Sequence, residues 1–171
     1  MTIWFRAIFA GILAVVLSGC ILQSKLPLFG DAQAKRLLAG YPNLVAYEKS
    51  GQDWVKSKEQ FVIAASGPRY TATVDKTELV FRFVPITGTW WVLQAVEAGK
   101  PASYVLVDAQ AGELLFYPIT CKALEASGSF TKLVKFAGAD CFIKFGADYK
   151  ALFTTLSEAP GEATTKLVSE P

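Results

Sequence analysis

Strict alternation of apolar and polar residues over short segments is the feature that most constrains the fold of this chain. In residues 69–74, Tyr70 and Val74 fall on one face and Arg69 and Thr73 on the other, which is the period of a β-strand. Other runs with strand character lie at 44–48, 60–65, 78–86, 90–97, 102–108 and 113–118. The later runs are joined by about four residues, which allows antiparallel neighbours but no parallel crossover. The sequence therefore predicts an antiparallel meander.

Three segments outside these runs have helical signals. Asp31 is placed to cap a short helix through Leu38, and residues 121–127 suit one or two helical turns ending at Gly128. Asp148 can cap a last helix that ends before Pro160 and has one apolar face, made of Tyr149, Leu152, Phe153 and Leu156. Two more strands are expected at 131–136 and 141–145. We expect an α+β fold: a meander of about seven or eight strands with a short N-terminal helix and a C-terminal helix packed on the sheet.

The N-terminus carries a targeting signal. One positive charge, Arg6, precedes an uncharged apolar run from Ala7 to Leu17. That run has the length of a signal-peptide h-region and is shorter than the roughly 20 residues that a bilayer-spanning helix needs. The alternative is a membrane anchor that stays uncut.

The end of this run, Leu17-Ser18-Gly19-Cys20, resembles the lipobox of bacterial lipoproteins. In that family a signal peptidase cuts before the cysteine after the cysteine sulfur has received a diacylglycerol. The resemblance implies that residues 1–19 are a signal peptide and that Cys20 is the lipid attachment site. It covers about the first 20 residues. The remainder is similar only in general to small uncharacterised lipoproteins of Proteobacteria, and no function carries over from that likeness.

The lipobox and the residue patterns together give the expected domain organisation. Residues 20–30 would be the lipidated N-terminus and a short tether, 31–160 a single globular domain, and 161–171 a polar tail. Ten extended residues span at most about 35 Å, so the domain should lie near the bilayer. In lipoproteins of many Gram-negative bacteria, an aspartate directly after the lipidated cysteine retains the protein in the inner membrane. Ile21 stands there in this chain, which favours the outer membrane, facing the periplasm.

The chain has three cysteines, and the lipobox accounts for the odd number. With Cys20 acylated, Cys121 and Cys141 remain as a pair, and outside the cytoplasm such a pair is expected to form a disulfide. A bridge closing a loop of about 20 residues stabilises by roughly 3 kcal/mol on the chain-entropy model. The alternative is two buried free cysteines.

The sequence contains few residue patterns that are typical of an active site. The chain has no histidine, which excludes Ser-His and Cys-His nucleophiles and removes the commonest metal ligand. We therefore expect no enzyme, no cofactor and no metal site. A carboxylate pair that could hydrolyse a glycosidic bond remains to be considered, but each candidate lies at or beside a predicted turn, where a solvated side chain explains it better: Glu97, Asp108, Glu113 and Asp140.

Three tryptophans are the candidate contact residues for a partner or ligand: Trp54, Trp90 and Trp91. Alternation sends Trp90 and Trp91 to opposite faces of their strand. The alternatives are that the sheet and its helices cover them, or that they lie at a bilayer interface.

The function expected from the sequence is that of a membrane-anchored, non-enzymatic envelope lipoprotein of binding or structural type. Its partners would be the lipid bilayer, through acylated Cys20, and another envelope protein or the cell wall. Nucleic acid is not expected, since Lys and Arg are spread along a chain of net charge +2. The alternative is a carrier of a small apolar ligand in a sheet-lined cavity, lined by aromatic side chains: Phe81, Phe83, Phe116, Tyr104 and Trp90.

Overall fold

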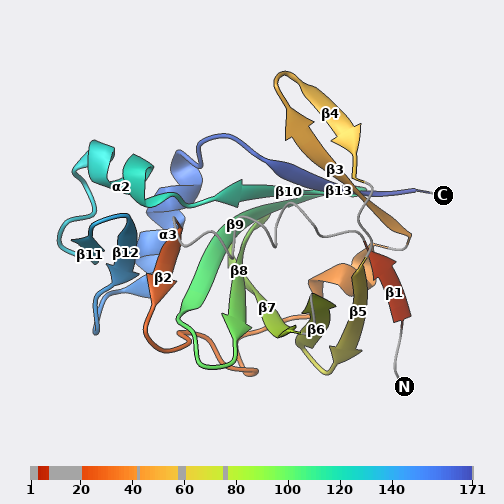
Figure 1. The fold of residues 1–171 in the computed structure, drawn as a ribbon, viewed down its shortest axis with the longest axis horizontal. Coiled ribbons are helices and arrows are strands. Elements are labelled where there is room, and N and C mark those ends of the chain that lie inside the picture. The colour runs from red at the N-terminus through yellow and green to blue at the C-terminus, as the bar shows by residue number, and fades with distance from the viewer. Residues whose placement is uncertain (1–3, 8–20, 42, 58–60, 75–76, 171) are drawn as a thin grey trace.

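A computed structural model describes residues 4–7, 21–41, 43–57, 61–74 and 77–170, and it shows one curved sheet with two α-helices (Figure 1). The first strands are β1 (Trp4–Ala7), β2 (Leu22–Ser24), β3 (Leu44–Ser50), β4 (Asp53–Lys56), β5 (Phe61–Ser66) and β6 (Arg69–Val74). The later strands are β7 (Thr77–Thr87), β8 (Trp90–Glu97), β9 (Ala102–Gln110), β10 (Glu113–Pro118), β11 (Val134–Ala137), β12 (Asp140–Ile143) and β13 (Thr165–Ser169). The helices are the 3-10 helix η1 (Leu37–Gly40), α2 (Cys121–Ser127) and α3 (Tyr149–Glu158).

The strands form an open sheet in the order β1-β5-β6-β7-β8-β9-β10-β13-β3-β4. β5 to β10 are the predicted meander, with each strand antiparallel to the next. Three more strands join through β9: β2 pairs with β9, β12 pairs in parallel with β2, and β11 pairs antiparallel with β12. The α+β class is confirmed, although the described strands outnumber the seven or eight predicted.

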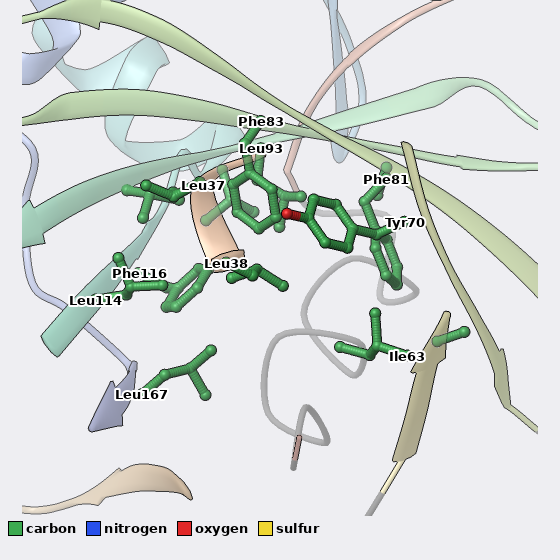
Figure 2. Packing of buried hydrophobic residues seen from close by; sticks show 14 of the residues in the cluster. Leu37, Leu38, Ile63, Tyr70, Phe81, Phe83, Leu93, Leu114, Phe116 and Leu167 are labelled. Carbon is green, nitrogen blue, oxygen red and sulfur yellow. The ribbon is translucent and has the colours of Figure 1, made fainter. Parts of the chain in front are cut away.

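Two apolar clusters lie on the two faces of the sheet. The inner cluster draws residues from η1 and from strands near both ends of the sheet, including β5 and β3, and its labelled side chains point toward a shared centre (Figure 2). The outer cluster contains buried residues of α2, α3, β2 and β12. Alternation along β9 serves both, because Val105 and Val107 join the inner cluster while Tyr104 and Leu106 join the outer one. β9 is consequently buried on both faces.

The two α-helices begin where the sequence predicts. The Thr120 hydroxyl accepts a hydrogen bond from the Ala123 amide at the start of α2, and Gly128 ends that helix with φ 65°. The Asp148 carboxylate accepts from the Ala151 amide at 3.0 Å and caps α3. α3 then packs on the sheet through Leu152, Phe153 and Leu156 of the outer cluster.

The helix expected from Asp31 to Leu38 is a turn followed by the short η1 instead. Asp31 does not cap it, because its carboxylate is held by Arg82 at 2.8 Å and Arg69 at 3.2 Å. Those two arginines lie directly opposite each other on β7 and β6. Like charges in that arrangement repel, and Asp31 offsets the repulsion from outside the sheet.

The prediction of a polar tail at 161–171 is wrong, because this segment contains the strand β13. Thr165–Ser169 lies between β10 and β3 and pairs antiparallel with both. Its central Leu167 is fully buried in the inner cluster. Two apolar residues in a polar stretch were too weak a signal for a strand whose partners lie about 50 and 120 positions earlier.

The prediction of a tether at 20–30 is also wrong, because residues 21–30 pack as part of the domain. Ile21 and Leu22 are buried, and β2 pairs with β9. Polar groups fix the following loop: the buried Gln94 side chain accepts from the amides of Leu28 at 2.8 Å and Phe29 at 2.9 Å. Its own amide donates to the Phe29 carbonyl at 2.9 Å. Buried polar groups need such partners, so Gln94 fastens this segment to β8.

Replacing Gln94 with Ala should destabilise the domain by about 2–4 kcal/mol, because the Leu28 and Phe29 backbone groups lose their partner inside the fold. The matched control is Gln33→Ala. Gln33 is exposed and accepts one hydrogen bond from Gly30, so that change should cost less than about 1 kcal/mol. Urea unfolding measures both. Equal losses for the two variants would contradict the role assigned to Gln94.

Candidate functional site

Cys20, the residue expected from the sequence to carry a lipid, lies outside the described residues, but the structure places its neighbour. Ile21 is 1% exposed and forms an antiparallel bridge with Thr120. The Leu22 amide donates to the Ile119 carbonyl at 2.8 Å. Consecutive Cα atoms are 3.8 Å apart, so a group on Cys20 would be attached within one residue of the packed core.

The predicted disulfide between Cys121 and Cys141 is confirmed, with an S–S distance of 2.08 Å and a Cα–Cα distance of 5.4 Å. Cys121 opens α2 directly after Thr120, and Cys141 in β12 pairs with Leu22. The bridge therefore joins the two segments that flank the start of β2. We call Ile21, Leu22, Thr120, Cys121 and Cys141 the attachment junction.

A second polar contact holds the chain just beyond the junction. The hydroxyls of Ser24 and Tyr104 are 2.6 Å apart, and the Leu28 amide donates to the Tyr104 hydroxyl at 3.2 Å. Burial raises the pKa of Tyr104 to about 12, although the hydrogen bonds from Ser24 and Leu28 act in the opposite direction. Tyr104 therefore stays protonated at neutral pH and can both donate and accept within this network.

An apolar groove adjoins the junction between α2 and the end of α3. Its volume is about 540 Å³, and its lining includes Thr120, Leu124, Phe130, Leu156 and Pro160. The hydroxyl of Thr120 is engaged in capping α2. A groove of this size and lining can hold a small apolar ligand. We refer to it as the α2–α3 groove.

The three candidate tryptophans are not brought together. Trp54 lies in the edge strand β4, where Lys166 Nζ sits 5.1 Å from its ring centroid. Trp90 and Trp91 begin β8, which four strands separate from β4 in the sheet. As the alternation predicts, they lie on opposite faces, with Trp90 against the outer cluster and Trp91 against the inner one. Both are half-buried.

Of the four candidate carboxylates, Asp108 and Glu113 lie at diagonal positions on one face of the paired strands β9 and β10. Glu97 binds Lys100 at 2.9 Å, and Asp140 begins β12. Asp108 differs from the expectation of a solvated turn residue, since it is buried in β9 and accepts a hydrogen bond from the Gln110 amide at 2.6 Å. The pKa of Tyr117 is raised first by burial and then by the nearby charges of Asp108 and Glu113.

Sequence reasoning missed Gln94, Tyr104 and Ile21 as the residues that fix the N-terminal segment. Two signals were present in the sequence. Gln94 interrupts the apolar strand Trp90–Glu97 with a polar amide, and Ile21-Leu22 places an apolar pair directly after the cysteine. Neither signal names its partner, because Gln94 and Phe29 are 65 positions apart.

Comparison of the chain with protein-family models, with curated proteins and with solved structures finds no match. Within the described part of the chain, no helix is long and apolar enough to cross a membrane. The same residues contain no group of three or more Cys, Asp or Glu side chains arranged to hold a metal ion.

Proposed function

We propose that this protein is a non-enzymatic envelope lipoprotein of binding or structural type, anchored through acylated Cys20 and facing the periplasm, with the outer membrane as its membrane. Its partners are the bilayer and another envelope protein or the cell wall. The lipobox-like Leu17-Ser18-Gly19-Cys20 supports the anchor. Ile21 supports the outer membrane, through the sorting pattern of such lipoproteins.

The observation that carries this proposal is the burial of Ile21 and Leu22 in the attachment junction. A lipid on Cys20 would join the domain without a flexible spacer. The domain would then be held against the bilayer surface and would work on partners that reach that surface. The Cys121–Cys141 bridge supports an oxidising compartment, since such bridges form and persist outside the cytoplasm.

Cys20→Ala tests the anchor. Cells producing the unaltered chain with a labelled fatty acid should yield a labelled protein whose peptide mass corresponds to residues 20–171 plus lipid. Cys20→Ala should incorporate no label, because the only acyl acceptor of the lipobox is gone. Lys25→Ala, at an exposed position nearby, is the control and should be labelled as fully as the unaltered chain. Label on Cys20→Ala, or an unaltered chain that keeps residues 1–19 and carries no lipid, would contradict the proposal.

The second candidate function is the binding of a small apolar ligand, and the α2–α3 groove is the observation that favours it. The sheet-lined cavity expected from the sequence is not the place. Its five aromatics divide between the faces: Phe81, Phe83 and Phe116 belong to the inner cluster, whereas Tyr104 and Trp90 belong to or pack on the outer one. They therefore do not line one cavity, and the groove replaces it as the ligand site.

Ala123→Trp tests this second candidate, because Ala123 lines the groove on the exposed side of α2. The indole should fill the groove and weaken binding of a fluorescent fatty-acid analogue at least about tenfold, the loss of roughly 1.4 kcal/mol of binding energy. The control is Lys122→Trp, at an exposed neighbouring position, which should bind as the unaltered protein does. Absence of saturable binding by the unaltered protein would exclude the groove as an acyl-chain site.

A further inference from the structure

The two ends of the sheet differ in how they are protected against pairing with other chains. The edge strand β4 carries Asp53 and Lys56, and Lys56 Nζ lies 3.5 Å from Glu170. Charges of this kind discourage other strands from adding to an edge. At the opposite end, β5 has the sequence Phe-Val-Ile-Ala-Ala-Ser and no charge. What protects β5 is β1, which pairs with it antiparallel.

β1 lies close to two other strands, β5 and β3. Trp4 is in register with Ala64 and Ala7 with Phe61 on one side. On the other side, Cα atoms of β1 lie within 8 Å of Cα atoms of β3. Figure 1 shows β1 beside β5, near the end of β3. We call this space between β5 and β3 the β1 slot.

Processing at Cys20 would empty the β1 slot, because β1 belongs to residues 1–19. The amide and carbonyl groups of β5 that face β1 would then lose their partners, and an apolar, uncharged edge would be open. An open edge of that composition is a template for pairing with another chain. The processed protein would thus differ from the full chain at one defined edge.

We propose that the β1 slot of the processed protein binds an extended, apolar segment of another envelope protein, which adds to β5 as an antiparallel strand. This rests on the proposed function, since it requires removal of residues 1–19. In such complexes the main-chain ladder supplies affinity, and alternate side chains supply specificity. The partner residue opposite Ile63 faces the inner cluster, because directly paired residues share a sheet face and Ile63 is fully buried. Apolar residues are therefore required there and two positions to either side.

A second copy of this chain fits the slot less well than a free segment does. The β5 of another copy is already paired with its own β6. It therefore arrives as the edge of a sheet, whereas the slot is bounded by β5 on one side and β3 on the other. A single strand can lie beside both β5 and β3, as β1 does in this structure.

The test uses the processed protein purified from membranes in detergent and a synthetic peptide with the sequence of residues 2–9. Peptide binding should be saturable and should slow hydrogen exchange of the β5 amides that face away from β6 at least about tenfold, because those amides regain partners. The control peptide carries Phe5→Pro, which removes one backbone donor and blocks a regular ladder. It should bind at least about tenfold more weakly.

Three outcomes would overturn the proposal. If the processed protein binds neither peptide, or binds both equally, strand addition at β5 is excluded while the lipoprotein assignment stands. If the β5 amides that face away from β6 are already protected without peptide and the protein is a dimer, a second copy covers the edge. If peptide mass analysis shows that residues 1–19 are retained, the slot is never vacated and the proposed function fails with it.

Discussion

The rest of the structure depends on one constraint: buried contacts fix the position of residues 21–29. β2 is short, yet it pairs with β9 on one side and with β12 on the other. Among the described strands, β2 is the one through which the β11–β12 hairpin pairs with the rest of the sheet. Gln94 and Tyr104 then hold the following loop with hydrogen bonds that water cannot replace inside the fold. A segment of low intrinsic strand propensity is thereby fixed by its neighbours.

The position of residues 21–29 also determines how far the domain could lie from a lipid attached to Cys20. A lipoprotein with a long polar tether can reach partners far from its membrane, whereas a cysteine attached directly to a core strand holds its domain at the bilayer surface. Thr120 belongs to two neighbouring features: it forms a β-bridge with Ile21, and it lines the α2–α3 groove. Ile21, which follows the proposed attachment residue, therefore lies beside a residue that lines the groove.

The parts of the fold that the sequence predicts correctly are those with local causes. The hairpins from β5 to β10 follow from period-two patterns and short turns, and Gly67, with φ 58°, makes the β5–β6 turn. The cap at Asp148 and the end of α2 at Gly128 are local as well. β2 and β13 were missed because both are short and obtain their stability from distant strands. Asp31 was misjudged for the same reason, since its capping pattern is local while its arginine partners lie about 40 and 50 positions away.

In the candidate site, too, the features with local causes could be predicted from the sequence and the others could not. The Cys121–Cys141 pairing could be predicted from the cysteine count and compartment, and the opposite facing of Trp90 and Trp91 from alternation alone. The groove and the β1 slot could not be predicted, since each is formed by segments that only the tertiary fold brings together.

Hydrogen exchange of the Leu22 amide in protein isolated from membranes tests the central claim, that the chain enters the core directly after Cys20. That amide is hydrogen-bonded to Ile119 in the structure. The account predicts exchange as slow as that of amides in the buried strand β9. Exchange as fast as that of the exposed Lys25 amide would show a free tether and contradict the claim.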